Sequence, residues 1–160
     1  MAYQGVAPIL MGSVSMVTAT RGVNDPEVGT KVNVDGRDYV FVYNGGTTQI
    51  SPGLGAVLQS SATGYTVTVS SVSSADVVIG VCRHATLTTA TYGWLVAKGI
   101  TPVQLGTTVS VSQRGLIEIG ANGVFEPVSN TTGNKAPAAG VALEAISTSA
   151  SGSAYVSCFG

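Results

Sequence analysis

Residues 31–43 read Lys-Val-Asn-Val-Asp-Gly-Arg-Asp-Tyr-Val-Phe-Val-Tyr, and this stretch decides the fold. Apolar and polar residues alternate on either side of Asp35-Gly36, with the period of two that is typical of β-strands. An Asp-Gly pair supplies the positive backbone φ that a tight turn between strands requires. The pattern therefore predicts two strands, Lys31–Val34 and Tyr39–Tyr43, joined by a turn.

The same alternation of Val, Ile, Thr and Tyr recurs along the chain, whereas helical periodicity is almost absent. Further turns are expected where Gly follows Asn or Pro, at Asn44-Gly45-Gly46, Pro52-Gly53 and Asn122-Gly123. Two stretches rich in Ser, Thr, Gly, Asn and Pro, Ser70–Asp76 and Ser129–Ala139, are expected to be longer loops. We predict further strands at Tyr65–Val69, Val77–Cys82, Tyr92–Lys98, Thr108–Val111, Leu116–Ile119, Gly140–Ala145 and Ala154–Cys158.

These strands predict an all-β fold, a compact β-barrel or sandwich-like domain with hairpins and an extended N-terminal segment. A chain of 160 residues is long enough to bury roughly 70% of the surface that its unfolded form exposes. We expect residues 1–20 to form the extended segment or arm and residues 21–160 to form the β domain. The β domain is either undivided or built from two small β modules that meet near residues 84–92.

Charge is scarce in this sequence. Only 9% of the residues are charged, seven basic against eight acidic, whereas about 25% is usual for a soluble domain. A net charge near zero favours association, so the composition suits a protein that packs against neighbours. The sequence contains no cluster of Lys and Arg that would neutralise phosphates, and we expect no nucleic-acid partner. No apolar run approaches the ~20 residues that a membrane-spanning helix needs, so we expect no membrane partner.

The first twenty residues are uncharged and apolar, but they lack the basic start of a secretory signal, and their longest apolar run contains Pro8. Such a segment would promote association if it were exposed. Two alternatives remain open at this point, an arm that contacts a partner or a first strand of the chain's own barrel. The candidate contact residues in it are Tyr3, Val6, Ile9, Leu10 and Met11.

Cys82 and His84 are the first candidates for chemistry, because their spacing places both side chains on one face of a strand. A Cys/His pair makes a nucleophile only when sulfur and imidazole are in hydrogen-bond contact, and strand neighbours two residues apart usually stand too far apart. We therefore interpret Cys82 as a packing residue. Cys158 is interpreted in the same way, since two distant cysteines do not form a disulfide framework.

Glu118 and Glu126 flank the Asn122-Gly123 turn, and paired carboxylates are typical of glycoside hydrolases. A loop of two or four residues would turn the two side chains to opposite faces, and only a three-residue loop would pair them. We interpret both as solvated strand charges.

The remaining motif search gives no site. Gly53-Leu54-Gly55 lacks the sequence context of a phosphate-binding loop, and we expect a turn there. Trp94 is expected to pack in the core or in an interface rather than to form a ligand platform. We expect no catalytic residues, no metal site, because one His and two Cys are too few for zinc, and no cofactor.

From Tyr92 onward the order of features resembles the decoration (cement) proteins of tailed-bacteriophage heads. These features are the segment Tyr92–Gly99, a Gly-ended strand at Gly115–Gly120, a loop with Asn130–Lys135, the segment Gly140–Ala145, and then Gly152 with Ala154-Tyr155-Val156. Asp38–Gly46, followed by Ile50 and Pro52-Gly53, is also similar to the N-terminal strands of such virion proteins. The resemblance touches about two thirds of the chain, through short motifs, and the segment 1–20 departs from the shorter members of the family.

The resemblance implies that Gly140–Ala145 and the closing strand form the last hairpin of a small β-barrel-like domain. It further implies a homo-oligomer, often a trimer, on the outer surface of a capsid shell, with the major capsid protein as partner. The expected locations are the virion and, during assembly, the host cytoplasm. The expected partner-binding residues are the five N-terminal ones and Trp94.

Three other functions compete with this one. The protein could be another virion component, such as a head fibre, tail or minor coat protein. A cell-surface adhesion or carbohydrate-binding module would need exposed aromatic side chains on one face. An enzyme with a shallow site on loops is the third alternative.

Overall fold

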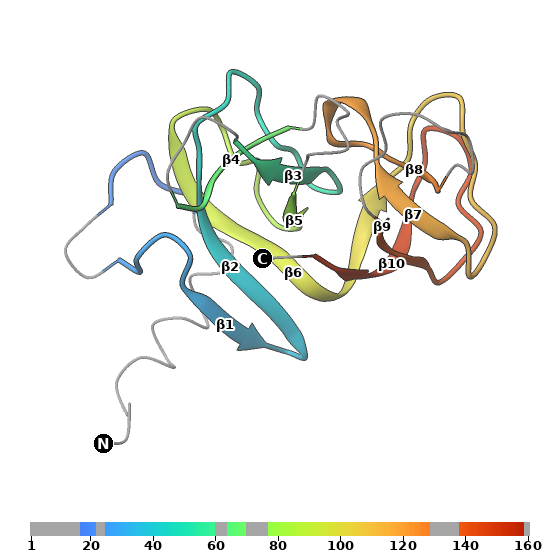
Figure 1. The fold of residues 1–160 in the computed structure, drawn as a ribbon, viewed down its shortest axis with the longest axis horizontal. Helices are drawn as coiled ribbons and strands as arrows, with labels where there is room; N and C mark the ends of the chain where they lie inside the picture. The colour runs from blue at the N-terminus through green and yellow to red at the C-terminus, as the bar shows by residue number, and fades with distance from the viewer. Residues whose placement is uncertain (1–16, 22–24, 60–63, 70–76, 129–137, 159–160) are drawn as a thin grey trace.

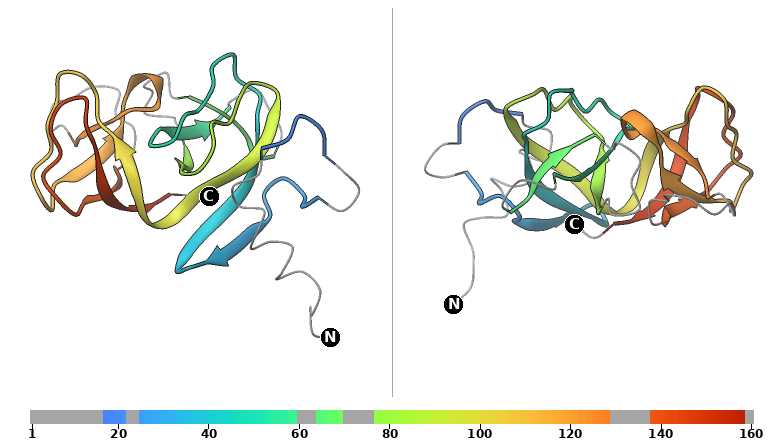
Figure 2. Two further views of the ribbon diagram at one scale, coloured as in Figure 1. Left: turned by 180° about the vertical axis from the view of Figure 1, so that it is seen from behind. Right: turned by 45° about the horizontal axis from the view of Figure 1, so that its top comes forward.

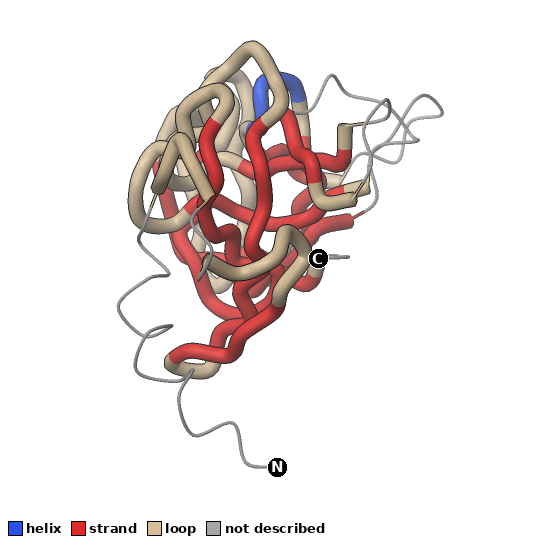
Figure 3. The backbone as a smooth tube through the Cα atoms, turned by 90° about the vertical axis from the view of Figure 1, so that its left-hand side faces the viewer, coloured by secondary structure: helices blue, strands red, loops and turns tan. Residues whose placement is uncertain are grey.

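The computed structural model describes residues 17–21, 25–59, 64–69, 77–128 and 138–158. Strands dominate it, and the described residues form a single short 3₁₀ helix, η1 (Ala121–Gly123) (Figures 1 and 3). The predicted all-β fold is confirmed. The strands are β1 (Lys31–Val34), β2 (Arg37–Asn44), β3 (Gly55–Leu58), β4 (Thr66–Thr68), β5 (Val78–Cys82), β6 (Thr91–Gln104), β7 (Leu116–Ile119), β8 (Phe125–Pro127), β9 (Ala138–Ala142) and β10 (Ser151–Ser157).

The first half of the chain forms a closed five-stranded β-barrel. Its strands follow the order β2-β4-β3-β5-β6, and β6 closes the ring by pairing with β2. All of these pairs are antiparallel except β2 with β4. β1 pairs with the outer side of β2 as a hairpin and stays outside the ring.

The second half of the chain adds strands to the same sheet in the order β6-β10-β9-β7-β8. β6 has 14 residues and serves both halves, since its first part pairs with β2 and β5 and its last part pairs with β10. Beyond β6, Leu105 meets Phe125 of β8 in a parallel bridge, so this part of the sheet also curls back toward β6. Figures 1 and 2 show the long curved β6 linking the two groups of strands.

Two hydrophobic clusters fill the molecule. The interior of the barrel holds one of them, with Val40, Val42 and Leu95 fully buried. The other joins the outer face of the β2–β6 pair, including Phe41, to the inner face of the C-terminal strands, including Phe125. The β2–β6 pair is therefore covered on both faces, as a strand pair apolar on both faces requires.

Glycine allows the two halves to approach closely. A Cβ built on Gly55 in β3 would lie 2.6 Å from Ile119 Cδ1 and 3.0 Å from Phe125 Cζ. Gly55 therefore belongs to a strand that packs directly on the C-terminal half, whereas Gly53-Leu54-Gly55 was predicted to be a turn. Gly53 does turn the chain, with φ of 88°.

The turns divide into those that follow the prediction and one that does not. Asp35 and Gly36 have φ of 50° and 73°, and Asn122 and Gly123 have φ of 58° and 79°, as predicted. Gly45 and Gly46 have no positive φ, and Asn44 ends β2 fully buried. A Cβ on Gly45 would lie 2.5 Å from Thr66 Cγ2. These glycines are needed because β4 passes close by, not because the chain reverses.

The structure corrects the strand predictions in several places, and the predicted strand Gly140–Ala145 is β9, which begins at Ala138 and ends at Ala142. Thr108–Val111 is not a strand, and only Val111 forms an isolated bridge, to Ile146. β3 and β8 were missed, since Gly begins one and Pro ends the other, and both residues are usually depleted in strands. β6 extends six residues beyond the predicted Lys98, to Gln104, because β10 pairs with this extension.

Candidate interaction surface

The outer face of the C-terminal strands carries most of the exposed apolar side chains. Five large apolar side chains among the described residues are more than a third exposed, and four of them, with exposed fractions of 38% to 54%, lie on this face. These four are Ile100, Leu116, Leu143 and Tyr155. The fifth, Val77, lies just before β5 in the other half of the chain.

The strand register makes these side chains neighbours. Ile100 in β6 lies opposite Tyr155 in β10. Tyr155 lies opposite Val141 in β9, and Val141 lies opposite Leu116 in β7. Directly opposite residues point to the same face, with Cβ atoms about 5 Å apart. Ile100, Tyr155, Val141 and Leu116 therefore form one continuous line across four strands, which we call the apolar row.

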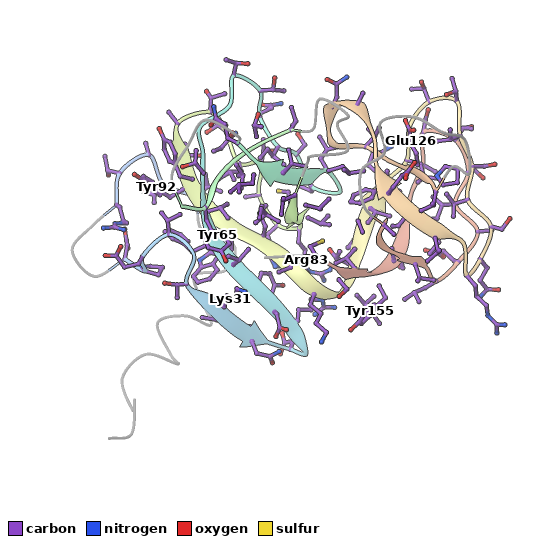
Figure 4. The ribbon with its side chains drawn as sticks, in the orientation of Figure 1. Lys31, Tyr65, Arg83, Tyr92, Glu126 and Tyr155 are labelled. Atoms are coloured by element: carbon purple, nitrogen blue, oxygen red, sulfur yellow. The ribbon has the colours of Figure 1, made fainter. Side chains whose placement is uncertain are left out.

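Alternation along each strand explains why the row faces outward. In the last part of β6, Gly99, Thr101 and Val103 are buried, while Lys98, Ile100 and Pro102 are exposed. The outward positions of such a strand are normally polar. Figure 4 shows Tyr155 pointing away from the ribbon at the lower edge of the molecule.

The apolar row was not predicted, although the sequence holds a signal for it. Leu116 stands one position out of phase with Ile117 and Ile119, which are buried. An apolar residue on the polar phase of an alternating strand indicates that both faces are apolar. The sequence alone does not tell whether such a second apolar face is exposed or covered, because β2 also has apolar residues on both faces and both of its faces are covered.

Charged residues stand two positions from each end of the apolar row, Lys98 on β6 and Glu118 on β7. Lys98, two residues before Ile100, lies opposite Ser157 at the β6 end. Glu118, two residues after Leu116, lies opposite Ala138 on one side and opposite Glu126 on the other. Of these two residues, Lys98 is exposed, whereas Glu118 is buried.

Glu118 and Glu126 lie opposite each other on one face of the sheet, so the loop between them has the length that pairs the two carboxylates. Gly120 N–H donates to the Val124 carbonyl oxygen over 2.7 Å just beyond the ends of β7 and β8, and the loop that these two residues close has three residues, Ala121–Gly123. That length is the one that pairs the two carboxylates. Glu118 is only 8% exposed, so its interpretation as a solvated charge is wrong.

Only one of the two carboxylates lines the hollow that the described residues form beside Glu126. Glu126 lines a hollow of about 340 Å³ together with Gln104, Thr108 and Asn122, but Glu118 is not part of that lining. General acid and base residues must both reach the bond that is cleaved. The hollow therefore presents one carboxylate rather than two.

Cys82 and His84 have separate partners. The Cys82 thiol donates to the Ala85 carbonyl oxygen at 3.2 Å, while His84 Nε2 lies 3.2 Å from the Tyr39 hydroxyl oxygen. Burial raises the pKa of the Cys82 thiol to about 11. Loss of hydration, followed by the charges of Arg83 and Arg37, lowers the pKa of His84. Both effects oppose a thiolate–imidazolium pair, in line with the packing role given to Cys82.

The candidate contact residue Trp94 lies in the core. It is 5% exposed, and its ring centroid lies 5.0 Å from that of Phe41. Its indole N–H has no hydrogen-bond partner. Trp94 is therefore too buried in the single chain to contact a partner, and it is not part of the interaction surface.

The other candidate contact residues lie outside the described residues, and their role stays a prediction. They are Tyr3, Val6, Ile9, Leu10 and Met11.

The described part of the chain contains no group of three or more His, Cys, Asp or Glu side chains placed to hold a metal ion. Within the same residues, no helix is long and apolar enough to cross a membrane. Both cysteines are free thiols. Thr18 pairs with Tyr92 at the start of β6, so the described residues 17–21 pass beside this strand.

Comparison with known proteins gives no assignment: no family model matches the chain, and no curated protein matches it.

Proposed function

We propose that the protein is a non-enzymatic structural component of a tailed-bacteriophage head, which binds the outer surface of the capsid shell and stabilises it. The observation that carries this proposal is the apolar row. Exposed apolar side chains that adjoin one another mark surfaces that are covered in an assembly. Here they lie on a rigid sheet, whose strands hold them in fixed register.

The low charge of the chain supports the same role. With 9% charged residues, the surface has little electrostatic repulsion to keep copies and partners apart. A protein of this kind is suited to contacts made by shape and apolar burial.

The resemblance to decoration proteins supports the choice of a phage head. The segments that carry it form neighbouring strands, since β10 lies between β6 and β9. Gly140–Ala145 begins in β9, which pairs antiparallel with the closing strand β10, as the resemblance implies. Two members of the apolar row, Val141 and Tyr155, belong to these segments.

Binding to the assembled shell, but not to its separated subunits, would stabilise the shell by mass action. Heads that lack the protein should therefore release DNA at a lower temperature, or after milder osmotic shock, than complete heads. Purified protein added back should restore resistance. A DNA-release assay on depleted, complete and replenished heads measures this directly. Equal stability of depleted and complete heads would contradict the stabilising role.

We propose the N-terminal segment as a shell contact in addition to the apolar row. In the same assay, protein with Ile9→Asp and Leu10→Asp should fail to restore resistance, while circular dichroism shows a folded β domain. If these variants unfold, the segment is a core strand and the shell contact lies elsewhere. Apolar contact should persist in salt that screens surface charges.

A further inference from the structure

We infer that Arg37, Arg83 and His84 together bind an oxyanion, a carboxylate or a phosphate group, where β2 meets the loop after β5. This inference goes beyond the proposed function and does not depend on it, because it concerns a small anion and the chain alone. The fold creates the site, since Arg37 begins β2 whereas Arg83 and His84 directly follow β5.

The Tyr39 hydroxyl and the His84 ring form the centre of the site. The hydroxyl oxygen lies 3.2 Å from His84 Nε2, and the two rings are stacked, with centroids 6.0 Å apart and an interplanar angle of 19°. Tyr39 is buried, whereas His84 is exposed. Because the hydroxyl engages Nε2, Nδ1 is the ring nitrogen that remains for a ligand.

Arg37 is held beside this pair by neutral groups. Its Nε donates to the Ile100 carbonyl oxygen over 2.6 Å, and its Nη1 donates to the Asp35 carbonyl oxygen over 3.4 Å. Gly99 leaves room for the side chain, since a Cβ on Gly99 would lie 3.0 Å from Arg37 Cγ. Both acceptors are uncharged, so the positive charge of Arg37 is not cancelled by them.

Arg83 brings a second cation to the same place. Its guanidinium forms no ion pair and no hydrogen bond with another described residue. The charges of Arg83 and Arg37 both act on Tyr39, and so does the carboxylate of Asp35. Two cations and one carboxylate leave one positive charge. Because the planar N–H donors of a guanidinium match the oxygens of a carboxylate or phosphate, this arrangement favours an oxyanion as ligand.

Anion binding should be coupled to protonation of His84. Loss of hydration, followed by the charges of Arg83 and Arg37, lowers the pKa of His84. A bound oxyanion would favour the imidazolium, whose Nδ1–H would donate to it, so binding should raise the pKa and tighten as the pH falls. The charged and titratable groups around the ring are Arg83 on the same loop, Arg37 and Tyr39 on β2, and Asp35 in the turn before β2.

The test is specific because His84 is the sole histidine of the sequence. NMR of the imidazole resonances in the complete 160-residue chain gives its pKa in chloride, acetate or sulfate at one ionic strength. Acetate or sulfate should raise the pKa of His84 by about half a unit or more above its value in chloride. The larger of the two rises tells whether the site takes carboxylates or phosphate-like dianions.

Arg83→Gln should change two values. The pKa of His84 in chloride should rise, because a charge that lowers it is removed. The additional rise in acetate or sulfate should largely disappear.

Arg114→Gln is the matched control, because Arg114 lies in the turn before β7, in the other half of the chain. It should leave both values as in the wild-type protein, and circular dichroism confirms that each variant is folded. Equal pKa values of His84 in the three salts would overturn the inference. An anion-dependent rise that Arg83→Gln leaves unchanged would do the same.

Discussion

The two ends of β6 lie in different surroundings, although they belong to one continuous strand. From Gly93 to Ala97 every residue is buried, because the barrel interior covers one face and the second cluster covers the other. From Lys98 to Val103 burial alternates, and only the inner face is covered. Apolar residues occur on the outer phase in both parts, so the difference lies in what covers them. An apolar outer face that the chain itself does not cover is the feature that indicates assembly.

The largest expected effect comes from truncating one side chain in each part of β6, which tests whether the two parts differ in burial. Leu95 is fully buried inside the barrel, whereas Ile100 is about half exposed. Leu95→Ala should lower the free energy of unfolding by about 2–5 kcal/mol, because it leaves a cavity as well as losing buried area. Ile100→Ala should cost less than about 1 kcal/mol in the isolated chain.

Urea unfolding of both variants, at one fixed protein concentration, measures this difference. Similar losses for the two variants would show that the outer face of the C-terminal half is covered by the chain itself. The apolar row would then be core, and neither the surface nor its proposed role would stand.

The contact between the halves offers a second way to test the comparison. Gly55→Ala should destabilise the protein by about 1–3 kcal/mol, since the added Cβ forces well-packed side chains aside. The side chains that must move, Ile119 and Phe125, are almost fully buried. The loss should appear in thermal unfolding as a lower midpoint with a single transition.

Gly106→Ala is the matched control for this variant. Its Cβ would meet Val109 and Val124 at ordinary contact distances of 3.4 and 3.5 Å, and its backbone φ is not positive. We expect its stability to stay within about 0.5 kcal/mol of wild type, because the added methyl group meets no atom closely enough to force a shift. If Gly55→Ala is equally well tolerated, the two halves are not packed as closely as the structure places them.

Strand bounds could be predicted from the sequence where nearby residues define them. They could not be predicted where pairing with a strand far along the chain defines them. β1 and β7 have their predicted bounds, since alternation and an adjacent turn define them. Thr108–Val111 alternates equally well but pairs only through Val111, because no strand lies beside the rest of it. The length of β6 depends on β10, which begins 47 residues after β6 ends, at Ser151 against Gln104.

The candidate site shows the same limit. The apolar row joins four strands between residues 100 and 155, and its members become neighbours only through register. Pairing of Glu118 with Glu126 depended on a loop length that Asn122-Gly123 alone does not define. Trp94 was predicted as a residue of either the core or an interface, because an aromatic side chain suits both. Its packing against Phe41 places it in the core.

The smallest expected effect concerns the two cysteines, one in each half of the chain. Burial raises the pKa of Cys82 to about 11 and that of Cys158 to about 12, from 9.0. Well below pH 9 both thiols are neutral whether the chain is folded or unfolded, and their contribution to stability is fully present. Between pH 9 and 11 the thiols ionise in the unfolded chain but stay protonated in the folded one. Stability should therefore fall as pH rises through this window, by about 1–3 kcal/mol for each thiol.

Comparison of the wild-type protein with the Cys82→Ser, Cys158→Ser variant isolates this effect. The variant should lose a modest amount of stability at pH 7, because each hydroxyl is a poorer packing group than the thiol it replaces. Its stability should then decline less steeply than that of the wild-type protein between pH 9 and 11, since the serines do not titrate. Urea unfolding at half-unit steps of pH gives both slopes. Equal slopes would mean that the thiols ionise as readily in the folded protein as in the unfolded one, and that the two cysteines are not the protected packing groups that their burial indicates.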